Sequence, residues 1–154
     1  MKPDLVAALE RASADVLETM FFTEPCPAVE DGGLRSDAVS CRLDCTGAVN
    51  GAFSLVIERG ALELLSEGFY GQEDKPFPTA DVDLACELAN MLAGATLSDY
   101  LPQQSCSLSS PLLSSLADHQ GMRRMVETGQ ETGAVDIQLD GGALSLLCVL
   151  AETA

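Results

Sequence analysis

The chain has 154 residues, a length that suits one domain with one hydrophobic core, and we expect that domain to span residues 1–154. Its formal net charge of −16 repels phosphate backbones and anionic membrane surfaces, so nucleic acid and membranes are excluded as expected partners. The charge fits two interpretations, a solubility requirement or attraction to a cationic patch on another protein.

Apolar residues make up 47% of the chain, but they occur in short runs. None of these runs approaches the ~20 apolar residues of a membrane-spanning helix. The first five residues lack the charged and then apolar pattern of a secretory signal. We therefore expect the protein to be made and kept in the cytoplasm.

The first expected element is a helix over residues 3–22. Its apolar residues recur at three- and four-residue spacing and so share one face: Leu5, Ala8, Leu9, Ala12, Val16 and Met20. Pro25 and Pro27 end this helix, and the run Asp31-Gly32-Gly33 indicates a loop.

Residues 38–58 are expected to form a β-hairpin. Its first strand alternates apolar and polar residues, with Val39, Cys41, Leu43 and Cys45 on one face. A turn near Gly47 leads to the second strand, over residues 51–58. A short helix over residues 61–69 and a loop over residues 71–78 follow.

The most regular predicted helix covers residues 79–98. Thr79 is the expected N-cap, and Asp81 and Asp83 fall in the first turn, where negative charge suits the helix dipole. One side of the helix is apolar and is expected to pack on a sheet: Leu84, Leu88, Met91, Leu92 and Ala95.

The remaining elements are expected to be strands. They cover residues 106–113, with an interruption at Pro111, residues 122–127, and residues 135–139 and 143–150, which the turn Asp140-Gly141-Gly142 joins. This order lacks the strict alternation of a doubly wound fold. It predicts an α+β fold, a two-layer sandwich in which helices cover one face of a largely antiparallel sheet.

A polar stripe lies beside the apolar side of the helix over residues 79–98. Its members are Asp83, Glu87, Asn90 and Gly94, at spacings of four, three and four residues. Every amphipathic helix has a polar face, so the spacing alone fits a solvent face. Asn and Gly, however, are poor residues for a helix interior. Their presence favours a surface kept free for the approach of a partner.

The run from Asp83 to Asn90 reads D-x3-E-x2-N, and Pro111 follows after twenty intervening residues. This pattern resembles the active-site signature of the CheC/CheX-type chemotaxis phosphatases, in which a proline follows the helical motif by about twenty residues. The resemblance extends over nearly the whole chain but is close only in the motif. It implies a CheX-like fold and hydrolysis of the aspartyl phosphate on a phosphorylated CheY-type response regulator.

The resemblance also implies roles for individual residues. Glu87 would pair with a lysine of the regulator, and Asn90 would orient the hydrolytic water. Asp83 and Pro111 would contribute to partner binding. A part in partner binding is also expected for Gly94, from its position on the polar stripe rather than from the resemblance. The chain itself would need no cofactor and no metal ligand, because the regulator would supply its own divalent metal ion. The alternative is a CheX-like module without catalysis that docks on a response regulator or a flagellar switch protein.

Some relatives carry a second copy of the motif on the first helix. Here Phe21 stands where the asparagine that follows Glu18 would be, and a phenyl group cannot hold water, so we expect one active site. CheX-like relatives often form homodimers, which makes a homodimer an expectation as well. The strand over residues 143–150 is either a free edge for such pairing or an interior strand.

Six cysteines are present, without a C-x-x-C pair, and His119 is the only histidine. We interpret most cysteines as small buried apolar side chains, rather than as metal ligands or disulfides. His119 is expected in a surface loop, and Arg123-Arg124 is expected to be solvated rather than to bind phosphate.

Overall fold

The computed structural model describes residues 4–21, 26–27, 37–70, 80–128 and 131–152. Within these residues, seven strands form one antiparallel sheet in the order β1-β6-β7-β3-β2-β4, and β5 also pairs with β2. The strands are β1 (Cys26–Pro27), β2 (Val39–Gly47), β3 (Val49–Ile57), β4 (Cys106–Leu108), β5 (Leu112–Ser114), β6 (Thr132–Leu139) and β7 (Gly142–Glu152). The helices are α1 (Leu5–Phe21), α2 (Arg59–Tyr70), α3 (Ala80–Tyr100) and α4 (Leu116–Thr128).

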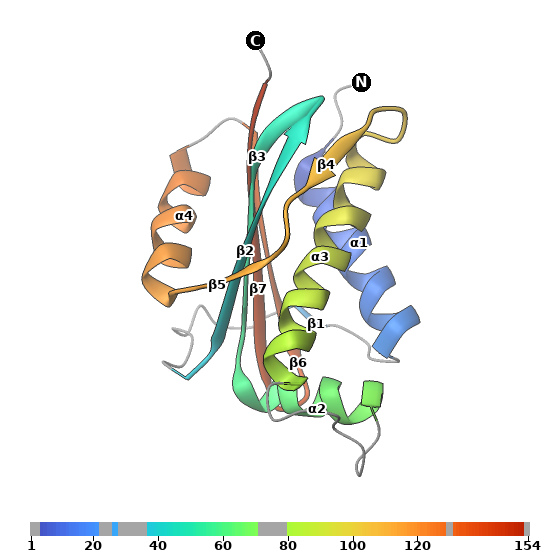
Figure 1. The fold of residues 1–154 in the computed structure, drawn as a ribbon, viewed down its shortest axis with the longest axis vertical. Coiled ribbons are helices and arrows are strands. Elements are labelled where there is room, and N and C mark those ends of the chain that lie inside the picture. The colour runs from blue at the N-terminus through green and yellow to red at the C-terminus, as the bar shows by residue number, and fades with distance from the viewer. Residues whose placement is uncertain (1–3, 22–25, 28–36, 71–79, 129–130, 153–154) are drawn as a thin grey trace.

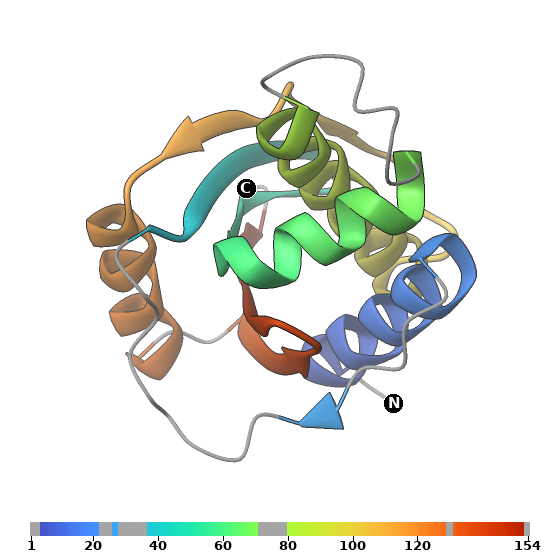
Figure 2. The ribbon, with the colours of Figure 1, turned by 90° about the horizontal axis from the view of Figure 1, so that it is seen from below.

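Helices cover both faces of this sheet (Figure 1). The α1 and α3 helices lie side by side on one face, and α2 crosses one end of the sheet (Figure 2). The α4 helix packs on the opposite face, against β7, β6, β3 and β2. The expected α+β class and antiparallel sheet are confirmed, but the second face is covered by a helix that the sequence analysis did not predict.

The expected strand over residues 122–127 is wrong, because these residues belong to α4. The buried or half-buried positions Leu116, His119, Met122 and Val126 recur at helical spacing, which becomes visible only over the full thirteen residues. The helix begins after Ser115, whose hydroxyl oxygen accepts a hydrogen bond from the amide of Asp118 at 3.0 Å, as an N-cap does.

The other expected elements are confirmed with small changes in their bounds. The β2–β3 hairpin turns at Gly47, which has a φ of 131°. The β6–β7 hairpin turns at Gly141 and Gly142, with φ values of 85° and 157°. The β7 strand pairs with both β3 and β6, so it is an interior strand rather than a free edge. Thr79, the expected N-cap of α3, and the expected loops at residues 31–33 and 71–78 lie outside the described residues.

The α3 helix is buried along most of its circumference because it packs against both the sheet and α1. Leu84, Leu88 and Leu92 are completely buried. The hydrophobic core therefore fixes the rotation of α3 about its axis and leaves only a narrow stripe for solvent. Within the described residues, no helix is both long enough and apolar enough to cross a membrane.

Candidate functional site

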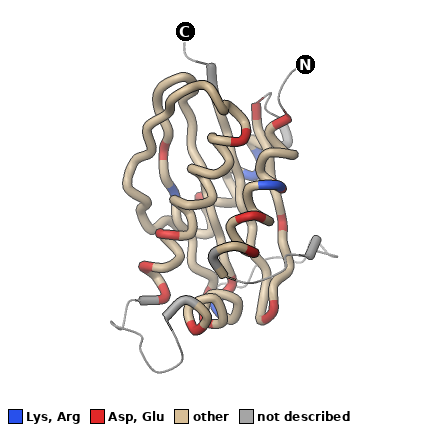
Figure 3. The backbone as a smooth tube through the Cα atoms, turned by 90° about the vertical axis from the view of Figure 1, so that its right-hand side faces the viewer, with Lys and Arg blue, Asp and Glu red and all other residues tan. Residues whose placement is uncertain are grey.

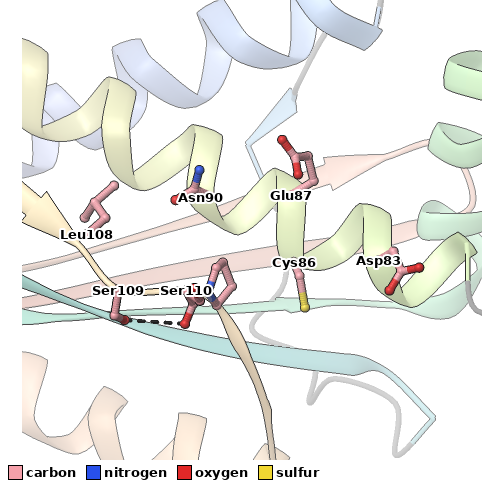
Figure 4. Close-up of a pocket in the computed structure, with 8 residues that line it drawn as sticks. Asp83, Cys86, Glu87, Asn90, Leu108, Ser109 and Ser110 are labelled. Atoms are coloured by element: carbon pink, nitrogen blue, oxygen red, sulfur yellow. Dashed lines mark hydrogen bonds between the residues drawn. The ribbon is translucent and has the colours of Figure 1, made fainter.

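The α3 helix presents two polar side chains on successive turns. Glu87 is exposed and Asn90 is half-buried, while their neighbours Leu88 and Ala89 are buried. Figure 4 shows Glu87 and Asn90 projecting from α3, with Cys86 directed toward the sheet. Because the buried leucines hold the helix in place, the two polar side chains keep a fixed spacing of about one turn.

The segment that connects β4 to β5 forms a second wall beside this stripe. Both strands pair with β2, so that Leu108 lies opposite Cys45 and Leu112 opposite Arg42. Three residues, 109–111, lie between Leu108 and Leu112, whereas only two residues lie between their partners on β2. This one-residue excess is the feature of a β-bulge, which bends a strand out of its ladder.

Ser109 anchors the bulge to β2. Its amide donates to the carbonyl oxygen of Asp44 at 2.8 Å, and its hydroxyl oxygen accepts from the amide of Asp44 at 2.9 Å. Pro111 has no amide proton to pair and lies at the edge of the sheet, where proline is tolerated. The extra residue is thus accommodated at Ser110 and Pro111, beside α3.

The two walls enclose a groove of about 520 Å³. Four of its lining residues come from α3 and four from the β4–β5 segment: Asp83, Cys86, Glu87, Asn90, Leu108, Ser109, Ser110 and Pro111. The predicted residues Asp83, Glu87, Asn90 and Pro111 therefore meet in one groove, although Pro111 is far from the others in sequence. Their roles stay predictions.

Gly94 lies one turn beyond Asn90 and does not line the groove. A Cβ atom placed there would lie 3.8 Å from Cδ1 of Leu108, an ordinary contact. Gly94 thus leaves the helix surface without a side chain next to the end of the groove, although the packing would tolerate a larger residue there. Its expected part in partner binding stays a prediction.

The groove is acidic. Among the described residues that line it are two carboxylates, Asp83 and Glu87, and no lysine or arginine. On this side of the molecule acidic positions are frequent and basic ones are few (Figure 3). One basic residue here, Arg11 of α1, is already paired with Asp99 of α3, and this guanidinium holds the pKa of the Asp99 carboxyl below its usual value. The site is therefore suited to a cationic group of a partner.

The sequence pattern did not indicate that Cys86, Leu108, Ser109 and Ser110 line the groove. Cys86 stands inside the motif, next to Glu87, and the two serines directly precede Pro111, so proximity to the motif was the available signal.

On α1, Glu18 is exposed whereas Phe21 is only 5% exposed. The position where a second asparagine would stand is thus part of the core.

His119 is not in a surface loop, as the sequence suggested, but on α4 with only 1% of its surface exposed. Its imidazole contacts the hydroxyl groups of Ser54 and Ser145. Burial, followed by the charge of Arg123, lowers the pKa of His119 to about 4. The histidine is on the opposite face of the sheet from the groove, so it is a packing residue rather than a member of the candidate site.

Several solved structures share this fold. The chemotaxis protein CheX from Desulfovibrio desulfuricans superposes with a TM-score of 0.71 at 16% identity, over 96% of this chain and 99% of that chain. CheX from Vibrio vulnificus gives 0.68 at 16% identity, over 96% and 97% of the two chains. CheX in the CheX–CheY–BeF3–Mg complex from Borrelia burgdorferi gives 0.66 at 16% identity, over 98% and 100%.

No protein-family model and no curated protein matches the sequence. The structural neighbours with TM-scores of 0.65 to 0.72 are CheX/CheC-like chemotaxis proteins, and they match nearly the whole chain. The resemblance that the motif indicated is therefore confirmed for the fold. At these low identities the likeness defines the fold and leaves the activity to be argued from the groove.

Proposed function

We propose that this protein is a phosphatase of response regulators, which hydrolyses the aspartyl phosphate of a phosphorylated CheY-type partner. The observation that carries the proposal is the position of Glu87 and Asn90, side by side in one groove of a CheX-like fold. A neighbour with this fold was crystallised together with CheY, BeF3 and Mg²⁺, which supports a CheY-type regulator as the partner.

Asn90 is the proposed catalytic residue. An aspartyl phosphate is already activated, so its hydrolysis chiefly needs a water molecule held in line with the phosphorus atom. A carboxamide offers both a hydrogen-bond donor and an acceptor and can orient such a water, as a glutamine does in GTPases. The divalent metal ion and the lysine that neutralise the phosphoryl group would come from the regulator.

Glu87 is the proposed docking residue. It is exposed at the rim of an acidic groove, where its carboxylate can reach a lysine of the partner. An ion pair at the edge of a groove is shielded from water on one side, so it is stronger than an ion pair in open solvent. Such a pair also fixes the position of one protein on the other. Asp83 and Pro111 would border the docked regulator, and Gly94 would let it approach.

Two further features belong to the proposal. The partner and the fold of the neighbours suit a protein that acts in the cytoplasm, where response regulators are phosphorylated. A homodimer is also proposed from the resemblance. The groove lies within one chain, so the proposed chemistry does not require a second copy.

The test is phosphate release from a phosphorylated CheY-type regulator of the same organism, with wild type, Asn90→Ala and Glu87→Ala. Gln120→Ala is a matched control, because Gln120 is an exposed carboxamide on α4, on the other face of the sheet. We expect wild type and the control to accelerate release equally. Asn90→Ala should lose about 100-fold of the acceleration while still binding the regulator.

Glu87→Ala should weaken binding as well as release. Circular dichroism and thermal unfolding of each variant would establish that the fold is retained. Binding of the regulator without any acceleration by wild type would contradict the phosphatase proposal. That result would favour the alternative, a docking module without catalysis.

A further inference from the structure

Two cysteines meet where α3 packs on the sheet. The sulfur atoms of Cys41, on β2, and Cys86, on α3, are 3.4 Å apart. The two cysteines lie 45 positions apart in sequence, so the contact is created by the fold. Cys86 lines the groove, next to Glu87, and one turn before Asn90, whereas Cys41 is completely buried beneath it.

This pair differs from the other described cysteines. Cys45 and Cys148 are buried, and burial raises the pKa of both thiols, that of Cys45 to about 11. Cys106 is half-buried on β4. Only Cys86 among the described cysteines combines contact with a second sulfur atom and a position in the groove.

We propose that Cys41 and Cys86 are a modification site for hydroperoxides, which oxidise the two thiols to a reversible disulfide. The partly exposed Cys86 reacts first: its sulfur attacks the peroxide, the O–O bond breaks, and Cys86 becomes a sulfenic acid. The sulfur of Cys41 then displaces the hydroxyl group. Two thiols and one hydrogen peroxide give one disulfide and two water molecules, and the thiols supply the two electrons.

The order of the two steps follows from exposure. The oxidant reaches Cys86 through the groove, while α3 and the sheet cover Cys41. Burial and the neighbouring sulfur raise the pKa of the Cys41 thiol, so Cys41 is a poor first nucleophile. It can still act as the second thiol, because its sulfur is held in contact with that of Cys86 and its proton leaves with the displaced hydroxyl group.

The disulfide would change the groove. Two bonded sulfur atoms are about 2 Å apart, so oxidation brings the sulfur of Cys86 closer to β2, and we expect the turn of α3 that carries it to shift in the same direction. Glu87 adjoins Cys86 and would move with it. The consequence for phosphate release rests on the proposed function: the oxidised protein should bind and dephosphorylate the regulator less well, and reduction should restore both.

The first experiment is independent of that function. The purified chain is treated with hydrogen peroxide, free thiols are blocked, and tryptic peptides are analysed by mass spectrometry. Trypsin separates Cys41, in residues 36–42, from Cys86 and Cys106, in residues 60–123. We expect these two peptides to become linked in wild type and in Cys106→Ser, and the link to disappear with dithiothreitol.

Cys86→Ser should lose the link, and Cys41→Ser provides a second variant in case one of them misfolds. A link that survives in Cys86→Ser or is lost in Cys106→Ser would overturn the assignment of the pair, as would the absence of any link in wild type. Regulator binding and phosphate release are then measured after the peroxide is removed. A linked protein with unchanged binding and release would overturn the proposed coupling, while the separate Asn90→Ala result tests the phosphatase activity.

Discussion

The Nδ1 atom of His119 lies 2.7 Å from the hydroxyl oxygen of Ser54, in a buried contact between α4 and the centre of the sheet. The other ring nitrogen is 3.1 Å from the hydroxyl oxygen of Ser145, on the adjacent strand β7. One imidazole thus ties α4 to both β3 and β7. Each serine hydroxyl can donate or accept, so both contacts are compatible with a neutral ring.

Stability should therefore fall when the pH drops from about 6.5 to about 4. The pKa of His119 is lowered to about 4 in the folded protein and is 6.5 without the fold, so in this window the unfolded chain binds the proton more readily. This difference in pKa contributes about 3 kcal/mol to the free energy of unfolding. The contribution is fully present above pH 6.5 and is fully lost only below pH 4.

Urea unfolding of wild type and His119→Gln at several pH values would measure this effect. The variant removes the titrating ring but keeps a donor and an acceptor, so the difference between the two proteins isolates His119 from the many carboxylates. Wild type should lose more free energy of unfolding than the variant between pH 6.5 and pH 4. Parallel pH profiles for the two proteins would contradict the prediction.

Elements whose own residues form a regular pattern could be predicted from the sequence. The leucines at positions 84, 88 and 92 predicted both the α3 helix and its buried side, and their burial leaves Glu87 and Asn90 on the stripe that the sequence indicated. The glycine turns of both hairpins were also recognisable, because they supply positive φ.

Features that arise between distant segments were not predictable in this way. The bulge at Ser110 and Pro111 depends on how residues 106–114 align with β2, some sixty residues earlier in the chain. Residues 122–127 taken alone do not distinguish a strand from a helix, and α4 becomes recognisable only together with the N-cap Ser115. The contact between Cys41 and Cys86 likewise exists only after α3 has packed on β2.

Gly94 offers a prediction that separates stability from function. Gly94→Ala should stabilise the protein by about 1 kcal/mol, because alanine favours a helix and the new methyl group makes only an ordinary contact with Leu108. The same variant should weaken regulator binding if the low surface is needed for docking. Gly121→Ala on α4 is the matched control, since it has open space and lies on the opposite face.

Thermal unfolding and regulator binding would be compared for the two glycine variants. Both should unfold at a higher temperature, but only Gly94→Ala should bind the regulator less tightly. Equal binding by wild type and both variants would contradict the proposed role of Gly94 in partner approach, without affecting the roles of Glu87 and Asn90.

Ser109 tests the wall of the groove. Ser109→Ala removes the oxygen that accepts from the amide of Asp44, and this exposed bond should contribute at most about 1 kcal/mol to stability. The wall at Ser110 and Pro111 would lose part of its anchor, so phosphate release should slow severalfold. Ser107→Ala is a control on the same segment that does not line the groove. Equal rates for both variants would mean that the anchor does not affect the site.

The last prediction concerns the charge of Glu87. Glu87→Gln keeps the size of the side chain and removes its charge, so it should weaken binding of the regulator about tenfold, the scale of losing one charge-assisted hydrogen bond. Glu10→Gln is the matched control, because Glu10 is also exposed and acidic but lies on α1, away from the lining of the groove.

Salt provides the discriminating measurement. Binding to the regulator loaded with beryllofluoride and Mg²⁺ is followed by isothermal titration calorimetry as the ionic strength rises. Screening weakens the contact of wild type and Glu10→Gln, so their affinities should fall with added salt, whereas that of Glu87→Gln should fall less steeply. If the affinities of all three proteins fall equally steeply with ionic strength, the acidic surface attracts the regulator only through its overall charge. Glu87 would then have no specific lysine partner, and the docking half of the proposal would fail even if Asn90 proved to be catalytic.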